Sequence, residues 1–113
     1  MITSTTIDSA TDTTLYTSSG TNAITVMIFC NTATPNTSDE TVNAVSLELS
    51  VVVGGQAVSD SNCIVKNLVI PAGETVFFDT ERLVLSNTDF VSGKLTSIDG
   101  TGSITATVST LTV

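Results

Sequence analysis

Strict alternation of apolar and polar residues is the strongest pattern in this chain. In residues 44–53, Ser46, Glu48 and Ser50 alternate with apolar residues as far as Val51. A period of two predicts a strand with one buried face. Residues 22–31 are apolar on both faces, which predicts a strand that is covered on both sides. In residues 44–53, the residues expected to share the buried face are Val45, Leu47, Leu49, Val51 and Val53. In residues 22–31, one face is expected to carry Ile24, Val26, Ile28 and Cys30, and the opposite face Ala23, Met27 and Phe29.

Residues 64–85, IVKNLVIPAGETVFFDTERLVL, contain three apolar runs separated by turn signals. Pro71 fixes the φ angle of a β-turn corner, and Gly73 can adopt the left-handed conformation that closes the turn. The pattern predicts three strands joined by tight turns into an antiparallel meander. In the first of them, Lys66 shares a face with Ile64, Leu68 and Ile70.

The remaining chain continues the β pattern. Further strands are predicted at 15–17, from Phe90 through Leu95, and at 103–113, where a change of parity near Ser109 suggests a bulge. Residues 32–41 form a polar loop. About eight strands without a helical pattern predict an all-β fold, an antiparallel β-sandwich that is either jelly-roll-like or immunoglobulin-like.

The N-terminal residues 1–14 are polar and rich in threonine, with Ile2 and Ile7 as their only apolar side chains besides the initial methionine and one alanine. We expect them to form an arm outside a single sandwich domain of residues 15–113, held in place by a partner such as a neighbouring subunit. This segment lacks the cationic start and apolar stretch of a secretory signal. The protein is therefore expected to work where it is made, or to leave the cell by lysis or within a particle.

The charge balance limits the possible partners. Eleven acidic residues oppose three basic ones, for a net charge of −8. Such a chain lacks the basic footprint of a nucleic-acid-binding or membrane-surface protein. The longest apolar run, residues 26–30, is too short to span a bilayer. Cys30 and Cys63 are expected to be reduced thiols, although a disulfide is possible if their strands are adjacent.

Catalytic chemistry finds little support in the sequence. Histidine is absent, which excludes the usual triads and most acid–base mechanisms. Two carboxylate pairs, Asp39 with Glu40 and Asp79 with Glu81, could support glycoside hydrolysis or bind calcium, but acids in predicted turns more often serve solvation and capping. Arg82 is expected to form a solvated ion pair with these neighbours. We therefore predict no enzyme, no cofactor, and no catalytic or metal-binding residues.

The aromatic residues are few: one tyrosine and four phenylalanines, without tryptophan. A sugar-binding platform usually needs exposed tryptophan or tyrosine. We therefore expect these side chains to fill the core. They are Tyr16, Phe29, Phe77, Phe78 and Phe90.

Three segments carry a family resemblance: LYTSSGTNAITVMIFCN from residue 15, IVKNLVIPAGETVFFDTERLVLSNTDFV from residue 64, and ITATVSTLTV at the end. Together they resemble small β-sandwich virion proteins of tailed bacteriophages, especially those that infect cyanobacteria and marine bacteria. The 32–41 loop is longer than in that pattern, so the resemblance does not indicate which partners would bind through this loop.

The resemblance implies a virion structural protein, located in the virion after synthesis in the host cytoplasm. A capsid decoration or cement protein is the first expectation, present in many copies, forming a homo-oligomer such as a trimer and binding the major capsid protein or other virion proteins. The alternatives are a neck, tail or baseplate accessory protein, or a carbohydrate- or receptor-binding module.

Overall fold

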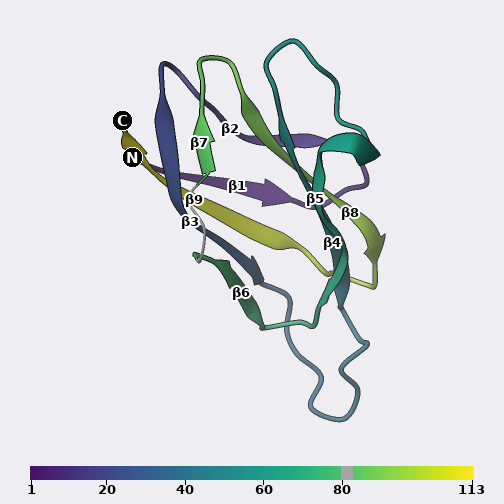
Figure 1. Cartoon of the computed structure of the whole chain (residues 1–113). Coiled ribbons are helices and arrows are strands. Elements are labelled where there is room, and N and C mark those ends of the chain that lie inside the picture. Colours follow the sequence, from purple (N-terminus) through teal and green to yellow (C-terminus); the bar gives the residue numbers. More distant parts are fainter. Residues whose placement is uncertain (80–82) are drawn as a thin grey trace.

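The computed structural model describes residues 1–79 and 83–113 as two antiparallel β-sheets packed face to face (Figure 1). One sheet has the strand order β1-β9-β3-β6, with β7 also paired to β3, and the other has the order β2-β8-β4-β5. The all-β sandwich predicted from the sequence is confirmed. The strands are β1 (Ile2–Ile7), β2 (Thr13–Thr17), β3 (Asn22–Asn31), β4 (Val45–Val52), β5 (Cys63–Ile70), β6 (Thr75–Phe78), β7 (Leu83–Leu85), β8 (Phe90–Ile98) and β9 (Ile104–Thr112).

The strand order is that of a jelly roll rather than an immunoglobulin fold. β1 pairs with β9, β2 with β8, β3 with both β6 and β7, and β4 with β5. This nested pairing is what results when one long hairpin is folded over into two sheets. β6 and β7 follow each other along β3 and together occupy one strand position, so eight positions are filled, as in other jelly rolls.

The predicted meander over residues 64–85 is wrong, although its turn is present. Glu74 N donates to Pro71 O at 3.2 Å, and Gly73 has φ +78°, a conformation that favours glycine. The chain then leaves β5's sheet and joins the opposite one, where Asn31 N donates to Glu74 O at 2.9 Å. The turn is a corner between the sheets, because the jelly-roll order separates β5 from β6.

The N-terminal residues 1–14, which were expected to form an arm outside the sandwich, are instead part of it. Residues 2–7 form β1, which pairs with β9 from Ile2 opposite Ser109 to Ile7 opposite Ile104. Ile7 is completely buried in the core. The rest of the segment leads into β2, so residues 1–14 belong to the sandwich and are held by their own chain. β-branched residues suit a pleated strand, which is why this polar stretch pairs so regularly.

The core lies between the sheets and is built mainly from aliphatic side chains. The ring of buried Phe29 meets that of the partly buried Phe78 edge to face, with centroids 5.7 Å apart. A register shift between Ile24 and Val26 turns Ile24 inward, together with Met27 and Phe29. The expectation that Ile24 faces the same side as Val26 is therefore wrong, because the extra residue of the bulge is Thr25 of β3, opposite Ser109 and Thr110 of β9.

The ends of the sandwich differ in their connections. The loop between β3 and β4 projects from one end, and the two termini lie side by side elsewhere (Figure 1). Buried Asn31 stabilises the loop end: its Nδ2 donates to Asn43 O and to Ile70 O, both at 2.9 Å. The helical content of the described residues is one 3-10 turn, Asp60–Asn62, and no helix there has the length and apolar character needed to cross a membrane.

Candidate functional site

The first candidate pair, Asp39 and Glu40, lies in the exposed loop between β3 and β4. The Asp39 carboxylate accepts hydrogen bonds from Thr41 Oγ1 at 2.7 Å and Thr41 N at 3.0 Å. These two bonds, the hydroxyl first, lower the pKa of Asp39 below its ordinary value. An exposed carboxylate that caps its own turn is engaged in local structure, not in acid–base work.

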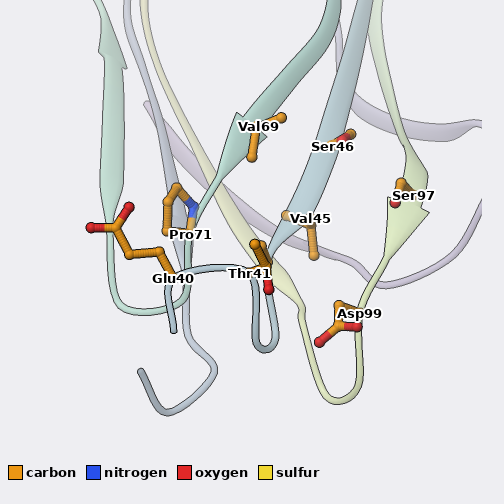
Figure 2. A pocket seen from close by; sticks show the side chains of 9 residues that line it. Glu40, Thr41, Val45, Ser46, Val69, Pro71, Ser97 and Asp99 are labelled. Carbon is orange, nitrogen blue, oxygen red and sulfur yellow. The ribbon is translucent and has the colours of Figure 1, made fainter. Parts of the chain in front are cut away.

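A hollow of about 430 Å³ opens beside this loop (Figure 2). Glu40 and Asp99 lie on opposite sides of it, and the Glu40 carboxylate extends away from the other labelled side chains. Asp99 Oδ2 already accepts a hydrogen bond from Asn43 N at 2.7 Å. The hollow therefore does not bring two free carboxylates together, as glycoside hydrolysis requires.

The second pair can be followed only in part. Asp79 is exposed, while Glu81 and Arg82, with the ion pair predicted for them, lie outside the described residues. Within the described ranges, 1–79 and 83–113, no group of three or more acidic, cysteine or histidine side chains could hold a metal ion. Cys30 and Cys63 are free and lie in different sheets, on β3 and β5.

A charged cluster occupies the outer face of the β2-β8-β4-β5 sheet, and the sequence patterns did not predict it. The Glu48 side chain on β4, only 8 % exposed, contacts Lys66 Nζ at 3.1 Å and Lys94 Nζ at 3.2 Å. Lys66 also contacts Asp60 at 2.9 Å, and Lys94 lies 3.9 Å from Asp12. Both lysines of the chain therefore converge on one nearly buried carboxylate.

Each charged group in this cluster stabilises the charged form of its oppositely charged neighbours. The hydrogen bond from Lys66 is the main reason that the pKa of Glu48 is lowered, and it outweighs the opposing effect of burial. Asp60 and Glu48 raise the pKa of Lys66 above its ordinary value, and Glu48 does the same for Lys94. The cluster ties β4, β5 and β8 together, and each of its three carboxylates and two lysines has an oppositely charged neighbour within 4 Å.

Sequence patterns missed the cluster because β5 is irregular. The register against β4 shifts twice, and Asn67 has φ +53°. These irregularities turn Lys66 and Ile64 outward, so the expectation that they share the face of Leu68 and Ile70 is wrong. Asn67 was the available signal, because asparagine tolerates the left-handed region better than most residues.

The outer face of the other sheet is very different, because within its described strands it carries no charged side chain. We call it the uncharged face. Alternation from the buried residues of each strand places its members on the solvent side. They are Ile2, Ser4 and Thr6 of β1; Ala23, Val26, Ile28 and Cys30 of β3; Thr75 and Phe77 of β6; Val84 of β7; and Thr105, Thr107, Ser109 and Leu111 of β9.

Several large apolar side chains on the uncharged face are open to solvent. Ile2 is 70 % exposed, Leu111 61 %, Phe77 60 % and Val84 59 %. Register places Leu111, Ala23 and Val84 in one row across β9, β3 and β7, and Phe77 beside Ile28 in another row. The apolar side chains thus follow one another across three neighbouring strands, with serine and threonine around them.

The aromatic residues follow the prediction only in part. Tyr16 and Phe29 are buried, Phe78 packs against the core, and Phe90 is half-buried. Phe77 contradicts the expectation of a core role, because it points to solvent from β6. Within the described strands it provides the uncharged face with its one aromatic side chain.

No family model, no curated protein and no solved structure matches this chain.

Proposed function

We propose that this protein is a virion structural protein of a tailed bacteriophage, a capsid decoration or cement protein that binds the shell in many copies. The observation that carries the proposal is the uncharged face. Although the chain has a net charge of −8, the described strands of this face carry no charged side chain and expose several large apolar ones. Contiguous exposed apolar surface marks interaction sites, and the centres of interfaces are depleted of charged residues.

The rest of the molecule suits a subunit that docks by this one face. The charged cluster lies on the outer face of the opposite sheet and would stay in solvent. Jelly rolls occur in viral capsid proteins, but also in lectins and cupins, so the fold is compatible with the proposal without selecting it. The proposed occupant of the uncharged face is the major capsid protein, and the proposal assigns no catalytic step to this chain.

Quantitative mass spectrometry of purified particles tests the virion assignment. Particles of the phage whose genome encodes the chain should contain it in a fixed, high ratio to the major capsid protein. A neck, tail or baseplate protein would instead be present in few copies. Its absence from particles would overturn the proposal altogether.

A binding experiment tests the docking face. Particles that lack the protein should take up purified wild-type chain, whereas Phe77→Asp should bind at least about tenfold more weakly, because a charge would be buried in the interface. Val53→Asp is the matched control, since Val53 is 58 % exposed but lies outside the uncharged face. Equal uptake of both variants would show that shell binding uses another surface.

A further inference from the structure

The four edges of the two open sheets differ in how well they are protected against pairing with another strand. The edges are β1 and the β6–β7 pair in one sheet, and β2 and β5 in the other. An edge strand exposes unpaired backbone groups, and proteins normally block it with charges, bulges, proline or short length. Comparing the four edges therefore shows where another chain could add.

Three of the edges carry such protection. β5 has two register shifts, and Lys66 points outward from it. β2 is bulged between Thr14 and Tyr16. β6 and β7 contain four and three described residues, so each offers only a short edge.

β1 carries none of these features. Its six residues, ITSTTI, include no charge, proline or glycine, and its pairing with β9 shows no register shift. Ile2, Ser4 and Thr6 are exposed. β1 is thus an uncharged edge without a bulge, and it is continuous with the uncharged face.

The alternation of hydrogen-bonded and non-bonded residues along β1 shows which of its backbone groups are free. Met1 and Thr110 exchange two hydrogen bonds, Thr110 N to Met1 O and Met1 N to Thr110 O, each 2.8 Å long. Bonded pairs alternate along an antiparallel ladder, so Thr3, Thr5 and Ile7 are bonded to β9. The N–H and C=O groups of the intervening residues then point away from β9, at the open edge.

We propose that β1 pairs with β1 of a second copy of this chain, antiparallel and about a two-fold axis at Ser4. In that register Ser4 faces Ser4 of the partner subunit, and Ile2 faces the partner subunit's Thr6. All three are residues with free backbone groups, so the three pairs can form about six hydrogen bonds. No charged side chain meets another across the joint.

The pairing joins two five-stranded sheets into one and places both uncharged faces on the same side. It closes after two copies, as an isologous interface must, in contrast to the trimer expected from the sequence. An edge contact alone buries little surface, so the dimer is expected to be weak and concentration-dependent. It concerns the free protein and does not depend on the proposed function.

Ser4→Pro tests the hydrogen bonding. Proline removes the Ser4 N–H, which faces the open edge and not β9, and edge strands tolerate proline at such positions. Sedimentation equilibrium should show a monomer–dimer equilibrium for wild type and for Ser4→Ala, and monomer alone for Ser4→Pro. A wild-type protein that stays monomeric at millimolar concentration, or that grows beyond dimers, would overturn the proposal.

Charge complementation tests the register without depending on proline. Ser4→Lys and Ser4→Glu should each be monomeric, because like charges would meet on the two-fold axis. An equimolar mixture of the two should dimerise at least as well as wild type, since the lysine of one variant would face the glutamate of the other across the joint. A mixture that stays monomeric would refute this register even if wild type dimerises.

Amide hydrogen exchange gives an independent readout. At high concentration the amides of Ile2, Ser4 and Thr6 should gain protection, while those of Thr3 and Thr5 should be protected at every concentration. Uniform behaviour of all five amides would count against pairing through this edge.

Discussion

The two sheets of this jelly roll present opposite surfaces to solvent. On the β2-β8-β4-β5 sheet, Glu48 lies between Lys66 and Lys94 and is almost completely buried by them. On the β1-β9-β3-β6 sheet, the outer face consists mainly of threonine and serine side chains, and Ile2, Phe77, Val84 and Leu111 are exposed among them. The first surface pairs its charges and still exposes Ile64 and Val69 of β5, whereas the described strands of the second expose apolar side chains with no charge among them.

The comparison shows how a small acidic chain can separate stability from association. Charged side chains that pair within one sheet hold its strands together and make that surface a poor docking site. A face without charge costs little desolvation when it is covered by another protein. We infer that stability and binding are assigned to different sheets, and substitutions in each sheet can test that division.

Among the polar side chains, the largest effect on stability is expected at Asn31, which lies at the junction of the two sheets. Asn31→Ala removes two donors and leaves the carbonyls of Asn43 and Ile70 without their partner. The loss should lower the free energy of unfolding by about 2–3 kcal/mol, because buried polar groups would be unsatisfied. Denaturant unfolding measures it, and Asn36→Ala in the exposed loop is the control. A loss similar to that of the control would mean that the corner is not stabilised by this amide.

A smaller effect is expected when the charged cluster is broken. Glu48→Gln should destabilise the protein by about 1–2 kcal/mol, because two charge-assisted contacts are lost but both lysines can turn to solvent. Glu40→Gln, at an exposed loop position, should change stability by less than about 0.5 kcal/mol. Equal unfolding midpoints for the two variants would contradict a stabilising role for the cluster.

The pH dependence of the same variant sharpens this test. Folding lowers the pKa of Glu48 from its ordinary value of 4.5, so its contribution is present above that pH and is lost as the pH falls through the folded-state pKa. The stability difference between wild type and Glu48→Gln should therefore be constant near neutral pH and shrink below about pH 4.5. A difference that persists unchanged in acid would assign the effect to shape and not to charge.

The smallest effect on stability is expected on the uncharged face. Phe77→Asp should change the free energy of unfolding by less than about 0.5 kcal/mol, because the side chain is 60 % exposed. The same substitution should weaken shell binding at least about tenfold under the proposed function. Phe29→Ala, at a fully buried position, should instead cost about 3–5 kcal/mol. A large loss of stability for Phe77→Asp would mean that this face serves the fold itself.

Several features of the fold could be predicted because they depend on local rules. The period of two in residues 44–53 placed Val45, Leu47 and Leu49 in the core. Val53 departs from it, because it is 58 % exposed where β4 has already ended. The turn at Pro71–Gly73 was predicted by the φ preferences of its residues, although its strands proved to lie in different sheets.

The candidate surfaces could not be predicted in the same way. Glu48 on an alternating strand is expected to point to water, and only the approach of β5 and β8 buries it under two lysines. Bulges in β3 and β5 change the side to which later residues point, and a one-residue shift reverses every assignment beyond it. The uncharged face becomes visible only when five strands from distant parts of the chain are aligned.

By itself, the sequence determined the all-β class, the positions of most strands and the acidic character of the protein. These follow from the side-chain period and from residue preferences, which act over a few neighbours. The tertiary structure decided the jelly-roll order, the inclusion of residues 1–14 in a sheet, and the contrast between the two outer faces. Those features depend on which strands pair, and pairing is a contact between residues as far apart as Ile2 and Ser109.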